Sequence, residues 1–213
     1  MAYTDLVDSQ VTVATDTATT YNFAYDLPIS ADGSPHVTQM GFLVEGQFAD
    51  DATLTSTLTG LINKVRIKVG SSTIMNWDDV VTTGASAVIP QLSVVIQKLG
   101  GLDVLQTQTG TGQLFQGVVT WPVGIDATRS QRINVQLGLD DVNTWAGNTN
   151  GFSSGATISM IHMYGTAKEA VIIGSRQDFT TTDSAEKVMT IYGKKGWSML
   201  GVAMCAPSVT ADG

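Results

Sequence analysis

The chain has 213 residues, 43% of them hydrophobic and only 14% charged, a composition that can bury the core of one folded domain and excludes an intrinsically disordered chain. The net charge of −8 arises within residues 1–63, which contain no Lys or Arg, and the absence of a basic arm argues against nucleic-acid binding. Only three of the 19 acids are Glu, whereas Thr, Val, Ser and Gly are frequent, so the composition predicts strands and turns.

Alternation of apolar and polar side chains predicts about ten strands. The clearest case is the segment 64–70, where Val65, Ile67 and Val69 share one face and the intervening Lys and Arg share the other. The turn Gly70-Ser71-Ser72 then leads into a second strand, which predicts a hairpin. The predicted strands are residues 10–15, 21–29, 37–48, 64–70, 73–77, 115–123, 131–139, 156–164, 187–192 and 197–205.

One segment has a helical period instead. Residues 90–99 begin with Pro90, end before Gly100-Gly101, and place four apolar residues at helical spacing, namely Leu92, Val95, Ile96 and Leu99. This pattern predicts a short amphipathic helix. A further helical turn capped by Asp78 is a second, weaker expectation, and the polar segments 106–113 and 143–155 are interpreted as exposed loops.

These elements predict an all-β fold, a single jelly-roll β-sandwich of about 8 to 10 strands with one short helix near residues 90–99. No period of about 20 to 50 residues repeats, so residues 1–205 are interpreted as one domain and residues 206–213 as a C-terminal tail. The N-terminal residues lack the charge and apolar run of a secretory signal, and no segment has the roughly 18 apolar residues of a membrane-spanning helix.

The motif from Gly151 to Gly155 matches the G-x-S-x-G spacing of a hydrolase, with Ser153 as nucleophile and His162 as a conceivable base. In a hydrolase this motif joins a strand to a helix, whereas here it follows a polar loop and precedes a predicted strand. A flexible loop is therefore the favoured interpretation. His162 shares a strand face with Ile158 and Met160, a position typical of a hydrogen-bonded core histidine.

Neither phosphate nor metal chemistry has a convincing motif. The Gly110-Thr-Gly112 segment lacks the Lys and the strand-to-helix setting of a phosphate loop. One cysteine and two histidines cannot form a zinc site unaided. Three Asp pairs are candidate Ca²⁺ ligands without Ca²⁺-loop spacing, so turn and cap roles are favoured for Asp50-Asp51, Asp78-Asp79 and Asp140-Asp141. No catalytic, cofactor-binding or metal-binding residue is assigned, and no cofactor is expected.

The four tryptophans are scattered along the sequence rather than gathered as a stacking platform. Trp77, Trp121 and Trp197 fall in predicted strands and are expected in the core or in an interface. Trp145 lies in the polar segment 140–150, which predicts an exposed contact surface between subunits.

The strands, the hairpin with its following Trp-Asp-Asp (residues 65–79) and the short helix together resemble the jelly-roll major capsid proteins of icosahedral, membrane-containing bacterial and archaeal viruses. The resemblance covers roughly residues 10–205, in the form of a single jelly roll. It implies a structural virion protein, not an enzyme, whose copies assemble into the viral capsid. The partners it implies are copies of the chain itself, a second capsid protein and an underlying membrane, without direct nucleic-acid contact.

Three alternatives remain open at this stage. A carbohydrate-binding or adhesin-like β-sandwich would bring Trp121, Trp145 and Tyr164 together and would often bind Ca²⁺. A hydrolase would use Ser153. A phage tail or baseplate component would be structural, like a capsid subunit, but would assemble differently.

Overall fold

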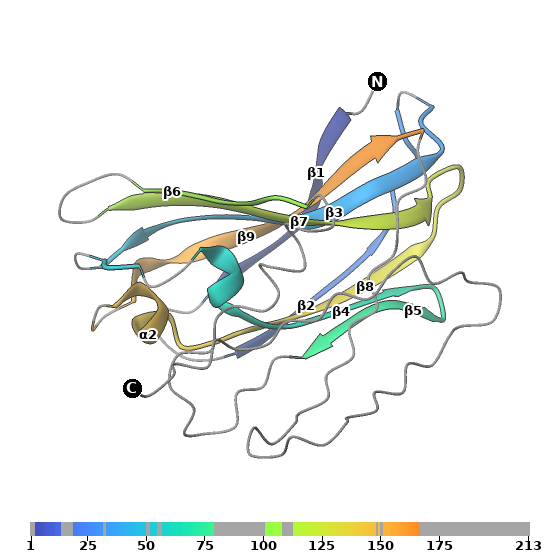
Figure 1. Ribbon diagram of the computed structural model, residues 1–213. Helices are drawn as coiled ribbons and strands as arrows, with labels where there is room; N and C mark the ends of the chain where they lie inside the picture. Colours follow the sequence, from blue (N-terminus) through green and yellow to red (C-terminus); the bar gives the residue numbers. More distant parts are fainter. Residues whose placement is uncertain are drawn as a thin grey trace, which may run out of the picture.

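The computed structural model describes residues 3–13, 19–31, 33–49, 52–54, 57–78, 101–107, 113–147, 149 and 151–166, which form two antiparallel sheets packed as a β-sandwich (Figure 1). The five-stranded sheet has the order β1 (Tyr3–Val13), β9 (Phe152–Gly165), β3 (His36–Phe48), β7 (Leu114–Asp126) and β6 (Asp103–Thr107). The four-stranded sheet has the order β2 (Thr19–Asp26), β8 (Arg132–Leu139), β4 (Ile62–Val69) and β5 (Ser72–Asp78). Two short helices, η1 (Leu58–Gly60) and α2 (Val142–Ala146), complete the described elements.

The strand pairings nest inside one another. β1 pairs with β9, β2 with β8, β3 with β7 and β4 with β5, and every pair is antiparallel. The described chain is therefore one long hairpin that turns between β4 and β5 and is rolled up, so that successive pairs belong to alternate sheets. This order is a jelly roll, with β6 added beside β7, and it confirms the predicted fold class.

The core lies between the sheets and is built by alternate residues of each strand. In one row across the five-stranded sheet, Met40 lies between Trp121 and His162, and in the next row Phe42 lies between Val119 and Met160. All of these side chains are buried. The four-stranded sheet contributes a facing apolar layer from each of its strands: Phe23, Tyr25, Val65, Ile67, Met75, Ile133, Val135 and Leu137.

The predicted hairpin is confirmed. Val69 pairs with Ser72, so the connection between β4 and β5 has two residues, and Gly70 adopts a φ of 56° in it. Tight hairpin turns require such positive φ values, which glycine adopts without strain. Val65 and Ile67 are fully buried, whereas Arg66 between them is exposed. The alternation in the sequence thus fixes which face of β4 meets the core.

The boundaries of two predicted loops and of one predicted strand were wrong. The loop at residues 106–113 begins inside β6, which ends at Thr107. The loop at residues 143–155 contains most of α2 and the first residues of β9. β1 begins at Tyr3 rather than at residue 10, because it follows β9 along much of its length. In each case, pairing or capping gives order to a segment whose polar composition favours a loop.

Several predictions lie outside the described residues: the helix at 90–99, the strands at 187–192 and 197–205, and the tail at 206–213. Asp78, expected as a helix cap, is instead the last residue of β5. Within the described part of the chain, no helix has the length and apolar character needed to cross a membrane.

Candidate functional site

The serine and histidine of the hydrolase hypothesis do not meet. Ser153 and His162 lie on the same strand, β9, nine residues and therefore about 30 Å apart along it. Ser153 is exposed, and its hydroxyl donates over 3.4 Å to the backbone oxygen and to the side-chain Oε1 of Gln47. His162 is buried in the core. This histidine cannot act as the base for this serine.

His162 forms a polar contact between the two sheets. Its Nε2 atom lies 2.7 Å from the hydroxyl of Tyr25 on β2, and the centres of the two rings are 5.6 Å apart. Burial lowers the pKa of His162 to about 4, so the imidazole is neutral at physiological pH. Burial also raises the pKa of Tyr25, and the nearby Tyr164 raises it further. The prediction of a hydrogen-bonded core histidine is confirmed.

Trp145 is a core residue, and the prediction of an exposed contact surface was wrong. It lies on α2, which begins where the Asp141 carboxylate accepts the backbone N–H groups of Asn143 and Thr144 and ends at Gly147 with a φ of 63°. Only 3% of Trp145 is exposed, and its Nε1 donates to the backbone oxygen of Thr57 over 3.0 Å. The capped helix α2 therefore directs the indole of Trp145 into the core, although the surrounding segment is polar.

A second polar cluster holds η1 against β6. The hydroxyls of Thr57 and Thr59 donate to Oδ2 of Asp103 over 2.6 and 2.7 Å. The backbone oxygen of Thr57 also accepts the indole N–H of Trp145. These hydrogen bonds connect β6, η1 and α2 at one end of the sandwich. Sequence reasoning missed this cluster, because Asp103 is 44 residues from Thr59 and no local pattern joins them.

Of the three Asp pairs, Asp140-Asp141 is the one that lies wholly within the described residues, and its members serve a turn and a helix cap, as expected. Asp140 accepts a hydrogen bond from the Asn63 side chain over 2.8 Å, and Asp141 caps α2. Asp50, Asp51 and Asp79 lie outside the described residues, as does the segment from Gly110 to Gly112. Among the described residues, no group of three or more His, Cys, Asp or Glu side chains is positioned to hold a metal ion.

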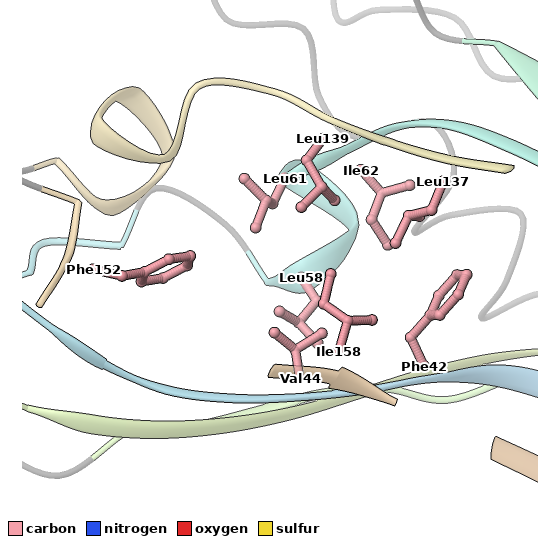
Figure 2. Close-up of a pocket in the computed structure, with 9 residues that line it drawn as sticks. All are labelled: Phe42, Val44, Leu58, Leu61, Ile62, Leu137, Leu139, Phe152 and Ile158. Carbon is pink, nitrogen blue, oxygen red and sulfur yellow. The ribbon is translucent and has the colours of Figure 1, made fainter. Parts of the chain in front are cut away.

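A small apolar cavity lies between the sheets near η1. Figure 2 shows side chains from β3, β9, η1, β4 and β8 pointing into it. Its free volume of about 10 Å³ is at the lower limit for a single water molecule, and no polar side chain lines it. The cavity is a packing defect of the core rather than a binding site.

The aromatic residues that a sugar-binding platform would use are buried. Trp121 packs against Phe42, with ring centres 5.4 Å apart, and Tyr164 packs against His162 at 6.1 Å. Trp145 contacts a separate aromatic cluster at the α2 end of the sandwich. The cluster of Trp121, Trp145 and Tyr164 that the carbohydrate alternative requires is therefore not a surface feature.

Three of the four large apolar side chains that are exposed in the described part of the chain belong to one surface; the fourth, Ile29, lies in the connection that follows β2. Leu102, just before β6, is 44% exposed, and Val104, within β6, is 47% exposed. Leu114 at the start of β7 is 49% exposed. These residues share the outer face of the five-stranded sheet, since Val104 pairs with Val118 and Leu114 is four residues along the same strand. We call Leu102, Val104, Leu114 and the strand β6 the β6 edge.

Comparisons with protein-family models, with curated proteins and with solved structures find no match for the chain. The jelly-roll fold and its surface are therefore the observations from which a function is argued.

Proposed function

We propose that this chain is a structural virion protein, a single jelly-roll major capsid subunit that self-assembles into an icosahedral shell. The observation that carries the proposal is the nested strand order, in which β1 to β5 and β7 to β9 form one complete jelly roll. Shell proteins use this architecture widely. Because one fold hosts many functions, the surface must supply the second argument.

Two surface properties support assembly. Only 14% of the residues are charged, which is low for a chain whose whole surface faces water and suits a subunit whose surface is partly covered by neighbours. The apolar residues of the β6 edge are exposed in the single chain and would be covered in a shell. In this function the protein acts by its geometry, because two packed sheets make a stiff block that presents fixed contact surfaces.

The charge distribution supports a shell without genome contact. Residues 1–63 contain eight acids and no Lys or Arg, and residues 64–213 are neutral. Such a chain lacks the clustered cations that neutralise phosphates. A shell built on an underlying membrane, with a second capsid protein in the lattice, is compatible with this distribution.

Electron microscopy and mass measurement of the purified protein test the proposal. We expect rings, trimers or closed shells whose fraction rises with protein concentration. A strictly monomeric mass at the highest attainable concentration would overturn the proposal. Open tubes or needle-like assemblies would favour a tail or baseplate component instead.

A further inference from the structure

We infer that the β6 edge is the surface through which two copies of this chain pair, strand β6 against strand β6. The inference rests on the proposed function, because it names one contact by which the shell subunits associate. Figure 1 shows β6 at the margin of the five-stranded sheet, beyond β7. In the described part of the chain, β7 is the only strand that pairs with β6.

The backbone of β6 offers hydrogen-bonding groups to a further strand. The N–H of Thr120 donates to the carbonyl of Leu102 over 2.9 Å, which makes these two residues a hydrogen-bonded pair of the ladder. In antiparallel strands such pairs alternate, so Val104 and Gln106 also direct their backbone groups toward β7. The N–H and C=O groups of Leu105 and Thr107 consequently point away from β7, toward the open edge.

The exposed side chains at this edge are apolar, and β6 lacks the features that usually prevent an edge strand from pairing with another chain. Lysine, proline and bulges normally blunt an exposed edge strand. β6 has the sequence Asp-Val-Leu-Gln-Thr, and its pairing with β7 has no register shift. On the same outer face of the sheet, Ser159 and Ile161 of β9 are buried, so the exposed apolar residues are concentrated toward β6 and β7.

Charge identifies a second copy as the occupant. Each chain carries a net charge of −8, so two copies can approach closely only where acids are few. The outer face of β6, β7 and the paired part of β3 carries two carboxylates. Glu45 accepts a hydrogen bond from Gln116, and Asp126, at the last position of β7, forms an ion pair with Arg129. Asp103 is held by two threonine hydroxyls of its own chain. This nearly neutral face is self-complementary.

The other three described edges are less suited to self-pairing. β1 contains Asp5 and Asp8, and its pairing with β9 is interrupted by a register shift between Leu6 and Gln10. β5 lies beside β4, whose Lys64, Arg66 and Lys68 place three like charges on one face. β2 ends at Asp26, which pairs with Arg132 on its exposed side. Two β6 strands related by a twofold axis would instead continue one antiparallel sheet across both subunits, with each contact made twice.

Backbone-directed variants test the inference. Thr107→Pro removes the backbone N–H of residue 107, which points away from β7 and toward the open edge. Thr107→Ala keeps this N–H and is the matched control. Val104→Lys places a charge on the β6 edge, and Ala24→Lys places the same charge at an exposed position of the edge strand β2. Sedimentation and light scattering over a concentration series measure association, and circular dichroism verifies that each variant is folded.

We expect Thr107→Pro and Val104→Lys to raise the dissociation constant of the pair by about tenfold or more, and both controls to associate like the wild type. If the wild type associates and all four variants associate equally well, the pairing at β6 is wrong and the proposed function stands. If the wild type remains monomeric, the proposed function itself fails.

Amide hydrogen exchange supplies a second readout that does not depend on any variant. In dilute monomer, the amides of Val104 and Gln106 should exchange slowly and those of Leu105 and Thr107 quickly. On association, the amides of Leu105 and Thr107 should become protected by about tenfold or more. Association without this change would place the subunit contact elsewhere and overturn the inference.

Discussion

The hydroxyl of Tyr25 and Nε2 of His162 lie 2.7 Å apart and join two sheets through residues that are 137 positions apart in the sequence. This hydrogen bond crosses an otherwise apolar interlayer, where an unpaired polar group is costly. The Nδ1 atom of His162 and Nε1 of Trp121 have no hydrogen-bond partner among the described residues. The Tyr25 contact is therefore the main compensation for burying this imidazole.

Removing the hydroxyl should destabilise the sandwich. We expect Tyr25→Phe to lower the free energy of unfolding by about 1 to 3 kcal/mol, since it leaves Nε2 of His162 buried and unpaired. Urea denaturation of Tyr25→Phe, His162→Phe and the double variant measures the coupling between the two side chains. Additive effects of the two substitutions would contradict an energetic link across the sheets.

Stability should depend on pH through His162. The pKa of His162 is about 4 in the folded chain and ordinarily 6.5. The contribution of the neutral, buried imidazole to the free energy of unfolding is therefore fully present above pH 6.5. As the pH falls from 6.5 to 4, the unfolded chain binds a proton that the folded chain does not, and the free energy of unfolding drops by about 3 kcal/mol in total.

Chemical denaturation of the wild type and of His162→Phe at several pH values between 6.5 and 4 measures this contribution. The variant should lose less stability than the wild type over that interval. The matched control is His36→Asn, which removes the other histidine and keeps the buried one. Parallel curves for the wild type and His162→Phe would show that His162 is protonated equally in the folded and unfolded chains.

Trp145 should be a major source of stability at the α2 end of the sandwich. We expect Trp145→Ala to cost about 3 to 5 kcal/mol, because it leaves a cavity beside Phe48 and Phe115 and leaves the carbonyl of Thr57 without its indole donor. Trp145→Phe keeps most of the apolar contact and should cost less. Thermal unfolding of both variants measures whether Trp145→Ala loses more stability than Trp145→Phe. If Trp145 were exposed, the two variants would differ little from the wild type.

Gly41 should tolerate no side chain. A Cβ at this position would overlap the carbonyl oxygen of Val119 and lie 2.7 Å from the Cα of Thr120, so the backbone of β7 would have to move. We expect Gly41→Ala to cost about 4 kcal/mol or more and to yield little folded protein. The control is Gly165→Ala, whose Cβ would meet only the movable side chain of Thr38, at 3.1 Å. Equal yields from both variants would contradict this prediction.

Strands that alternate clearly were predictable because one face of each is buried. The hairpin at Gly70 and the strand from residue 131 follow this rule, and the structure places both in the four-stranded sheet. The strand count and the short elements together predicted the jelly roll. The pairing of β1 with β9 depends on contacts between distant residues that no local pattern contains.

The errors share one physical origin, which is order imposed by neighbours on polar segments. β6 is a five-residue strand with one apolar pair, and it is ordered by β7 and by the threonines that bind Asp103. For α2 the sequence did contain a signal, since Asp141 is a good N-cap and Gly147 a good C-cap six residues later. Those caps, rather than composition, identify the helix that buries Trp145.

The nested strand order also constrains how the chain reaches its native state. Tyr3 pairs with Tyr164, so the five-stranded sheet cannot be completed until nearly all the described residues are available. Among the nested pairs, only the innermost hairpin, β4 with β5, closes a short loop, and each outer pair must close a longer one; β6 and β7 form a second local hairpin outside this nest. Such a topology folds slowly, on a timescale of about milliseconds to seconds or longer, and leaves strand edges open meanwhile. Newly made subunits would therefore be most prone to wrong association before β9 is in place.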